Sequence, residues 1–227
     1  MCGRYTQLRS WPDLVALYGI AESLSPSNFP VRYNIAPTQQ VAAVRRRADT
    51  GDRALVTLRW GLVPSWAKQI DIGARLINAR AETVHEKPAF RDAFRKRRCL
   101  IVADGFYEWQ AQPAGPKQPW LVTVADGRPF AFAGLWEEWW DAGNTLIESC
   151  AIVTTAANAA LTPIHDRMPA ILTAERFDAW LDPAAQPAAL RALLVPYPGA
   201  MTARPVGRRI NDVRNDDPGC IEPVGAA

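Results

Sequence analysis

Short runs of alternating apolar and polar residues, separated by turn-forming residues, are the feature that most restricts the fold of this chain. Such alternation has the period of a half-buried β-strand. Eight runs have this pattern: Gln40–Arg46, Ala54–Trp60, Arg98–Val102, Tyr107–Gln110, Trp120–Val124, Phe130–Trp136, Leu146–Thr154 and Ala170–Thr173. Turn signals such as Ala125-Asp-Gly-Arg and Ala142-Gly-Asn lie between them. The pattern therefore predicts a framework of mostly antiparallel strands.

Helical signals are fewer and lie between or after these runs. Ser10-Trp-Pro-Asp13 starts a short helix to about Tyr18, with Ser10 as the N-cap, Asp13 completing a capping-box pattern and Gly19 as the end. Three further helices are expected: Pro88–Lys96, Ala174–Leu181 with Thr173 as its cap, and Gln186–Leu194. Because no repeat, linker or low-complexity segment divides the chain, we expect one α+β domain over residues 1–227. Its sheet is expected to be barrel-like, closed or half closed, with peripheral helices.

Size and charge exclude several classes of protein. A chain of 227 residues removes roughly 70–75% of its unfolded surface from water, so it can form a core without disulfides. No apolar stretch approaches about 18 residues, and the start of the chain has no basic-then-apolar signal segment, so we expect no membrane partner and a cytoplasmic location. The net charge of +3 is too small to indicate a protein that binds nucleic acid through charge alone.

The cysteines do not form a metal-binding pattern. Cys2, Cys99, Cys150 and Cys220 include no CxxC pair and no zinc spacing, so we expect neither a metal nor another cofactor. Cys99 and Cys150 lie in apolar runs, where a free cysteine behaves as a small buried hydrophobic residue.

Cys2 differs from the others because removal of Met1 would make it the amino-terminal residue. Its α-amine, with a reference pKa of about 7.7–8.0, would then stand beside its thiol in a 1,2-aminothiol. Such a group condenses with an aldehyde to an imine, and the thiol then closes on the imine carbon to form a thiazolidine. Position alone favours the other interpretation, a cysteine that stands at residue 2 by chance.

Several polar segments interrupt the apolar strand pattern. They are Cys2-Gly-Arg-Tyr5, Tyr33-Asn-Ile-Ala-Pro-Thr38, Arg59 to Trp66, Asn78 to Thr83, Arg98 to Trp109, Ala133-Gly-Leu-Trp136, Thr154 to Asn158, and Ile164-His-Asp-Arg-Met-Pro169. The last contains His165, which is a candidate acid or base near neutral pH and equally compatible with a structural role in a loop. Each segment alone is a weak signal.

Together, the order and spacing of these segments resemble the SOS response-associated peptidase (SRAP) family, the abasic-site DNA–protein crosslinking proteins. The resemblance covers residues 2–169 as the motif-bearing part and leaves 173–227 as a helical region and tail. One departure is Val102, where the family usually has proline, and it concerns a local turn rather than the chemistry.

The resemblance implies that Cys2 captures the ring-opened aldehyde of an abasic site in single-stranded DNA and protects the lesion as a thiazolidine. Glu108 would be the acid/base group, and a position between two aromatic residues would raise its pKa. His165 would stabilise or protonate the sugar-ring oxygen and assist reversal of the crosslink. Asn78 would orient the sugar or the Cys2 amine without adding a charge.

The same resemblance implies how DNA is held. Arg4, Arg80 and Arg167 would bind phosphates, while Trp66 and Pro64 would stack or wedge against bases, a contact worth about 1–3 kcal/mol per base. The basic run at residues 95–98 is interpreted as a solvated face. We expect a monomer that associates with the nucleoid when it is bound to single-stranded DNA containing abasic sites.

Two other interpretations remain open at this point. Cys2, His165 and Glu108 are also the elements of a thiol peptidase, although only Met1 precedes Cys2 and an aminopeptidase would release it equally well. The third interpretation is a non-catalytic module that binds single-stranded or modified DNA.

Overall fold

Five strands close into a barrel in the computed structural model, which describes residues 2–20, 30–125, 127 and 130–224. They are β3 (Gln40–Arg46), β4 (Arg53–Trp60), β6 (Arg98–Ala103), β9 (Phe130–Trp140) and β10 (Leu146–Ala156). Pairing runs from β10 to β4, β3, β6 and β9, and a long antiparallel β9–β10 ladder closes the circle. Only the β4–β10 pair of this barrel is parallel. The expected barrel-like, mostly antiparallel α+β fold is confirmed.

Three short strands extend the barrel sheet, and two of them carry predicted site residues. β5 (Asn78–Arg80) pairs in parallel with β10, and β11 (Arg167–Pro169) pairs antiparallel with the end of β10. β12 (Ile171–Leu172) pairs antiparallel with β9. The second half of β10 therefore has β5 and β11 as its partners, and these two strands carry three of the predicted site residues.

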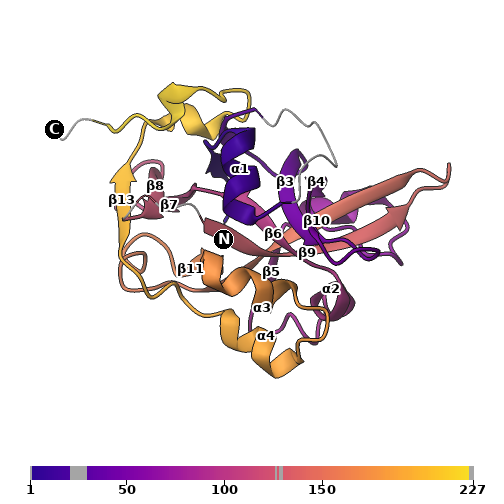
Figure 1. Cartoon of the computed structure of the whole chain (residues 1–227). Helices are drawn as coiled ribbons and strands as arrows, with labels where there is room; N and C mark the ends of the chain where they lie inside the picture. The colour runs from indigo at the N-terminus through magenta and orange to yellow at the C-terminus, as the bar shows by residue number, and fades with distance from the viewer. Residues whose placement is uncertain (1, 21–29, 126, 128–129, 225–227) are drawn as a thin grey trace.

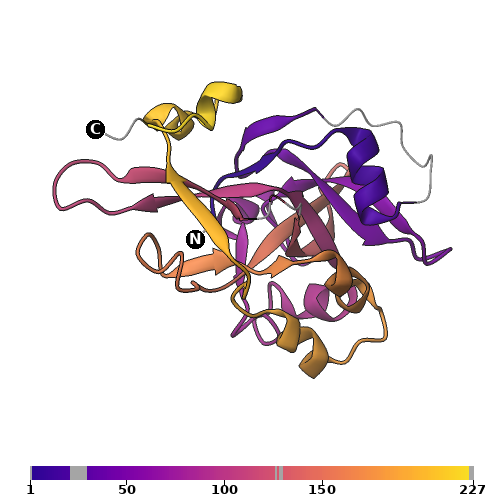
Figure 2. The ribbon, with the colours of Figure 1, turned by 60° about the vertical axis from the view of Figure 1, so that its left-hand side comes forward.

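A second sheet covers one side of the barrel. Its order is β13 (Met201–Pro205), β8 (Gln118–Val124), β7 (Gly105–Gln110), β1 (Tyr5–Gln7) and β2 (Arg32–Ile35). Figure 2 shows the β7–β8 hairpin extending away from the body with β13 beside it. Side chains of both sheets share one core cluster, which includes Tyr5, Phe106 and Val122 from this sheet and Ile101, Phe132 and Ile152 from the barrel.

The helices are short and peripheral. They are α1 (Trp11–Tyr18), α2 (Arg91–Lys96), α3 (Phe177–Leu181) and α4 (Pro187–Leu193). In Figure 1, α2, α3 and α4 gather on one side of the barrel while α1 lies on another. None of the helices in the described ranges is long and apolar enough to cross a membrane.

The ends of α1 agree with the sequence. The Asp13 carboxylate accepts hydrogen bonds from the Ser10 N–H (3.2 Å) and the Ser10 hydroxyl (2.6 Å), and Gly19 ends the helix with φ 57°. Thr173 stands at the expected N-cap position, but its side chain makes no capping hydrogen bond, and residues Ala174–Arg176 form a tighter 3₁₀ turn before α3 begins.

Arg98 is not solvated as expected but is buried between two helix ends. Its guanidinium donates to the carbonyls of Phe94 (2.8 Å) and Arg95 (2.6 Å) at the end of α2. It also donates to Trp180 (2.7 Å) and Asp182 (2.6 Å) at the end of α3. Carbonyls at a helix end lack partners within the helix, so one planar cation satisfies both ends at once.

Candidate active site

Cys2 lies fully buried in the core between the barrel and the second sheet. The residues after it run beside β7, because the Tyr107 N–H donates to the Arg4 carbonyl at 3.0 Å. Asn78 Nδ2 donates to the Cys2 carbonyl at 2.9 Å, and the Cys2 thiol approaches the Arg4 carbonyl at 3.9 Å. The start of the chain is therefore fixed by strands from both sheets.

Glu108 reaches the same region because of the two-residue period of β7. Phe106 and Glu108 point towards the core shared with the barrel, while Tyr107 and Trp109 pack on the opposite face. The Glu108 residue is only 2% exposed. This burial raises the pKa of the carboxyl, and the nearby His165 opposes the increase.

Burial and the nearby Glu108 both affect the pKa of the Cys2 thiol. Burial raises its pKa far above the ordinary value, and the negative charge of Glu108 adds to the increase. The side chain is therefore a protonated thiol at neutral pH rather than a thiolate.

His165 lies in the loop between β10 and β11, with Nε2 3.9 Å from Glu108 Oε2. Its Nδ1 accepts a hydrogen bond from the Arg167 N–H at 2.9 Å. The same Nδ1 lies 3.1 Å from Asp166 Oδ1, so this side of the ring is held by neighbouring residues of the loop. Nε2 is left facing Glu108, so the imidazole and the carboxyl form a pair able to exchange a proton as the site rearranges.

β5 presents Asn78 and Arg80 on one face, because they are two residues apart, and buries Ala79 on the other. Asn78 Oδ1 is buried and has no hydrogen-bond partner, although its Nδ2 holds Cys2. A buried acceptor without a donor is unfavourable, so this oxygen is ready to accept from a group that enters the site.

The three arginines predicted to bind phosphate differ in their exposure and in their hydrogen-bond partners. Arg80 is exposed at the end of β5. Arg167, at the start of β11, is bound by Glu82 through two hydrogen bonds of 2.6 and 3.0 Å. Arg4 donates to Asn34 Oδ1 (3.0 Å) and to the Ile210 carbonyl (2.6 Å).

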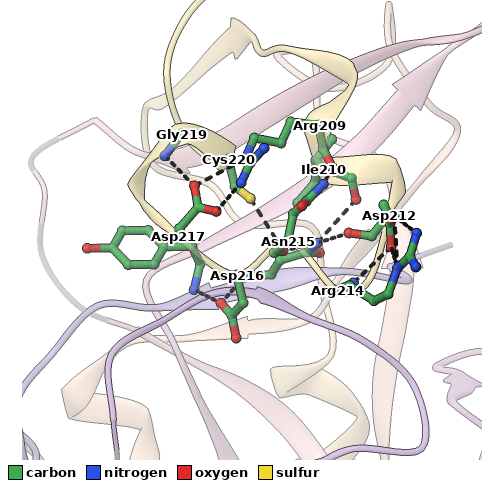
Figure 3. Close-up of polar contacts among 11 residues, drawn as sticks. Arg209, Ile210, Asp212, Arg214, Asn215, Asp216, Asp217, Gly219 and Cys220 are labelled. Carbon is green, nitrogen blue, oxygen red and sulfur yellow. Dashed lines mark hydrogen bonds and ion pairs between the residues drawn. The ribbon is translucent and has the colours of Figure 1, made fainter.

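The contacts of Arg4 depend on a C-terminal segment, residues 206–224, that sequence reasoning did not place in the site. Figure 3 shows how this segment is held in shape by ion pairs of Arg209 with Asp217 and of Arg214 with Asp212. Fully buried Asn34 of β2 joins it to the second sheet by donating to the carbonyls of Ile210, Asp212 and Asn215. The only signal in the sequence was the position of Asn34 within a polar interruption.

Trp66 is 59% exposed on a turn closed by the Ala67 N–H to the Pro64 carbonyl at 2.8 Å. The Trp139 indole N–H of β9 donates to the Ala67 carbonyl at 2.7 Å and holds this turn on the barrel. Pro64 is buried, so its ring shapes the turn and the open aromatic face belongs to Trp66. Stacking by either residue stays a prediction.

A metal site does not emerge from the described residues, because no three His, Cys, Asp or Glu side chains gather to hold an ion there. The site instead combines a buried thiol, a buried carboxyl, an imidazole and a carboxamide with arginines at its edge. Together with the barrel, this arrangement defines a class of α+β proteins that have a cysteine-containing site at the start of the chain.

Comparison with known proteins identifies the class. The family model described as SOS response associated peptidase (SRAP) matches residues 1–213, and the chain belongs to this family. The resemblance inferred from the sequence segments is thereby confirmed.

Relatives and solved structures agree with this membership. The chain is 40% identical over 224 residues to the abasic site processing protein YoqW of Bacillus subtilis, covering 98% of this chain and 99% of the relative. It is 30% identical over 270 residues to the mouse abasic site processing protein HMCES, covering 99% of this chain and 76% of the relative. The crystal structure of a Bacteroides thetaiotaomicron protein superposes with a TM-score of 0.86 at 27% identity, covering 98% of this chain and all of that one.

Proposed function

We propose that this chain recognises abasic sites in single-stranded DNA and forms a covalent thiazolidine crosslink through Cys2 after Met1 is removed. The observation that carries the proposal is the convergence of buried Cys2 and Glu108 with half-buried Asn78 and His165 in one site. Membership of the SRAP family and the similarity to proteins named for abasic site processing support the same substrate.

The reaction needs two bond-forming steps and releases one water molecule. The neutral α-amine attacks C1′ of the ring-opened aldehyde, and the resulting carbinolamine loses water to give an imine. The thiol then adds across the imine, with sulfur bonding to C1′ and the thiol proton passing to nitrogen. Glu108 takes a proton as the amine attacks and returns it to the departing hydroxyl, a role suited to a carboxyl with a raised pKa.

The protonated thiol supports this order of events. An amine attacks an aldehyde without a thiolate, and the thiol loses its proton only when the imine carbon is already beside it. A thiol peptidase needs the opposite arrangement, in which a neighbouring cation lowers the pKa of the thiol. Here burial raises the pKa of the thiol and the charge of Glu108 adds to the increase, which supports crosslinking over peptide hydrolysis.

His165 and Asn78 complete the proposed machinery. Nε2 of His165 faces Glu108, and the imidazole would protonate the sugar-ring oxygen during opening, with the same transfer serving reversal. The unpartnered Asn78 Oδ1 would accept from the sugar or the amine. Arg4, Arg80 and Arg167 would bind the flanking phosphates, and Trp66 would stack on a neighbouring base.

The test uses the full chain, with loss of Met1 verified by intact mass, incubated with a single-stranded oligonucleotide that contains one abasic site. A denaturing gel should show an adduct that survives heating. Cys2→Ala should abolish the adduct, and Glu108→Gln should slow its formation by about 100-fold, the ordinary contribution of a general acid/base. Cys150→Ala and exposed Glu138→Gln are the matched controls and should crosslink at the wild-type rate.

Three outcomes would overturn the proposal. Absence of an adduct from protein that has lost Met1 would exclude crosslinking. Turnover of peptide substrates that depends on Cys2 would identify a peptidase, and salt-sensitive binding without a covalent product would identify a binding module. Sequencing the amino terminus of Cys2→Ala would show whether Met1 removal requires the thiol or an aminopeptidase.

A further inference from the structure

Arg167 already binds an anion that belongs to the chain itself. Glu82 Oε1 and Oε2 accept from two different nitrogens of its guanidinium at 2.6 and 3.0 Å. This bidentate contact is the geometry with which arginine binds a phosphate. The Thr154 carbonyl accepts from the same guanidinium at 2.7 Å, so the arginine is fixed by the barrel while its outer face is occupied by Glu82.

Arg4 is held in a different manner. Its hydrogen-bond acceptors are neutral groups, the Asn34 amide oxygen and the carbonyls of Ile210 and Asn211, so these contacts orient the cation without cancelling its charge. Arg80 extends into solvent. Of the three arginines proposed to contact phosphate, Arg167 is the one that needs an exchange of partners before DNA can bind.

The structure provides a place for the displaced carboxylate. Glu82 lines an open cavity of about 490 Å³, and Arg191 of α4 lines the same cavity. Arg191 is exposed, and its guanidinium lies 3.5 Å from His85 Nε2. Because the Glu82 side chain is 52% exposed, it can leave Arg167 without disturbing the core.

We propose that Glu82 determines the affinity of the Arg167 site by occupying it until a DNA phosphate takes its place, and that Arg191 then receives the displaced carboxylate. This inference rests on the proposed function, because it concerns the same strand of DNA. The hydrogen bonds from Arg167 hold the pKa of Glu82 below its ordinary value, so Glu82 is an anion throughout the neutral range and competes with phosphate there.

The arrangement selects ligands that engage several arginines. A free phosphate must displace Glu82 unaided. A strand already held at Arg4 and Arg80 presents its next phosphate at a high effective concentration, so it displaces Glu82 more readily. Glu82 therefore weakens the binding of a ligand that contacts Arg167 alone more than the binding of a strand that contacts all three arginines.

The experiment measures binding of a single-stranded oligonucleotide carrying a tetrahydrofuran abasic analogue, which has no aldehyde and does not crosslink. Fluorescence anisotropy should show that Glu82→Gln lowers Kd by about fivefold, the scale of one partly exposed ion pair. Arg191→Gln should raise Kd by about two- to threefold. Glu86→Gln, an exposed acid on the same loop, is the control for net charge and should stay within about twofold of wild type.

Combining the variants separates this exchange from general electrostatics. Because Arg191 acts only on the displaced carboxylate, Arg191→Gln should have no effect in the Glu82→Gln background. Equal or weaker binding by Glu82→Gln, or an Arg191 effect that persists in the double variant, would overturn the inference. Wild-type adduct formation is measured in parallel on an authentic abasic site. If wild type forms the adduct but Glu82→Gln does not bind the oligonucleotide more tightly, only the role of Glu82 is refuted. If wild type forms no adduct, the proposed function is refuted.

Discussion

The buried carboxyl of Glu108 illustrates how a single residue can favour chemistry at the expense of stability. A buried carboxylate is poorly solvated, so the folded chain holds the Glu108 proton more tightly than the unfolded chain does. The stability that this preference contributes is fully present below the ordinary glutamate pKa. It is lost as the pH rises through the higher pKa of the folded state.

Glu108→Gln should therefore stabilise the fold while it slows crosslinking. We expect its free energy of unfolding to exceed that of wild type by about 1–2 kcal/mol at pH 8, and the difference to vanish near pH 4, where wild type is protonated too. Urea unfolding at both pH values measures this, with exposed Glu138→Gln as the control. A variant less stable than wild type at pH 8 would show that the carboxylate is stabilised by its surroundings.

At the scale of elements, Arg98 joins the ends of α2 and α3 through four carbonyls. A lysine carries a compact ammonium and cannot reach all four, so some carbonyls would remain buried without a donor. Arg98→Lys should cost about 2–4 kcal/mol in chemical unfolding. Exposed Arg95→Lys should cost less than about 0.5 kcal/mol. Equal stability of the two variants would refute the bridging role.

Neighbouring tryptophans of β9 offer a second test. Trp139 holds the turn that carries Trp66, whereas Trp140 points outwards and is 53% exposed. Trp139→Phe keeps the ring but removes the indole donor, so it should weaken binding of the abasic-analogue oligonucleotide by about three- to tenfold. Trp140→Phe should leave Kd unchanged. An equal effect of Trp139→Phe in a Trp66→Ala background would contradict positioning through Trp66.

Length explains only part of which elements could be predicted from the sequence. Gln40–Arg46 was predicted at its observed bounds, and the alternation in β4, β6, β9 and β10 was sufficient to identify the barrel strands. The strands β1, β5 and β11 were missed because three residues contain too little alternation to recognise, and β2 and β13 were missed as well. The partners of these strands are distant in sequence, so only the assembled sheets define them.

The candidate site could also be predicted only in part from the sequence. The chemistry proposed for Cys2 follows from the distinctive reactivity of an amino-terminal aminothiol and from the family resemblance, and it stays a prediction. The contact of Asn78 with the Cys2 carbonyl and the capture of Arg167 by Glu82 could not be predicted, since both depend on how β5 and β11 flank β10. The C-terminal segment that orients Arg4 was missed for the same reason.

At the scale of the whole molecule, the small net charge of +3 fits a protein that binds DNA through a small number of phosphate contacts. Each phosphate contact in a single strand contributes about −0.7 to the slope of log K against log salt concentration. Three arginines therefore predict a slope of about −2 for the abasic-analogue oligonucleotide, and alanine at Arg80 should reduce its magnitude by about 0.7. A slope unchanged in that variant would exclude Arg80 as a phosphate contact.

Closure of the barrel by β9 and β10 also divides the site between two stretches of chain. Cys2, Asn78 and Glu108 precede the exposed tip of this hairpin, while His165 and Arg167 follow it. A chain opened between Ala142 and Gly143 would give two fragments, each with an incomplete set of reacting groups. They would regain the site only by re-forming the ladder along the barrel seam. Adduct formation on the DNA strand would then report that the two fragments had assembled.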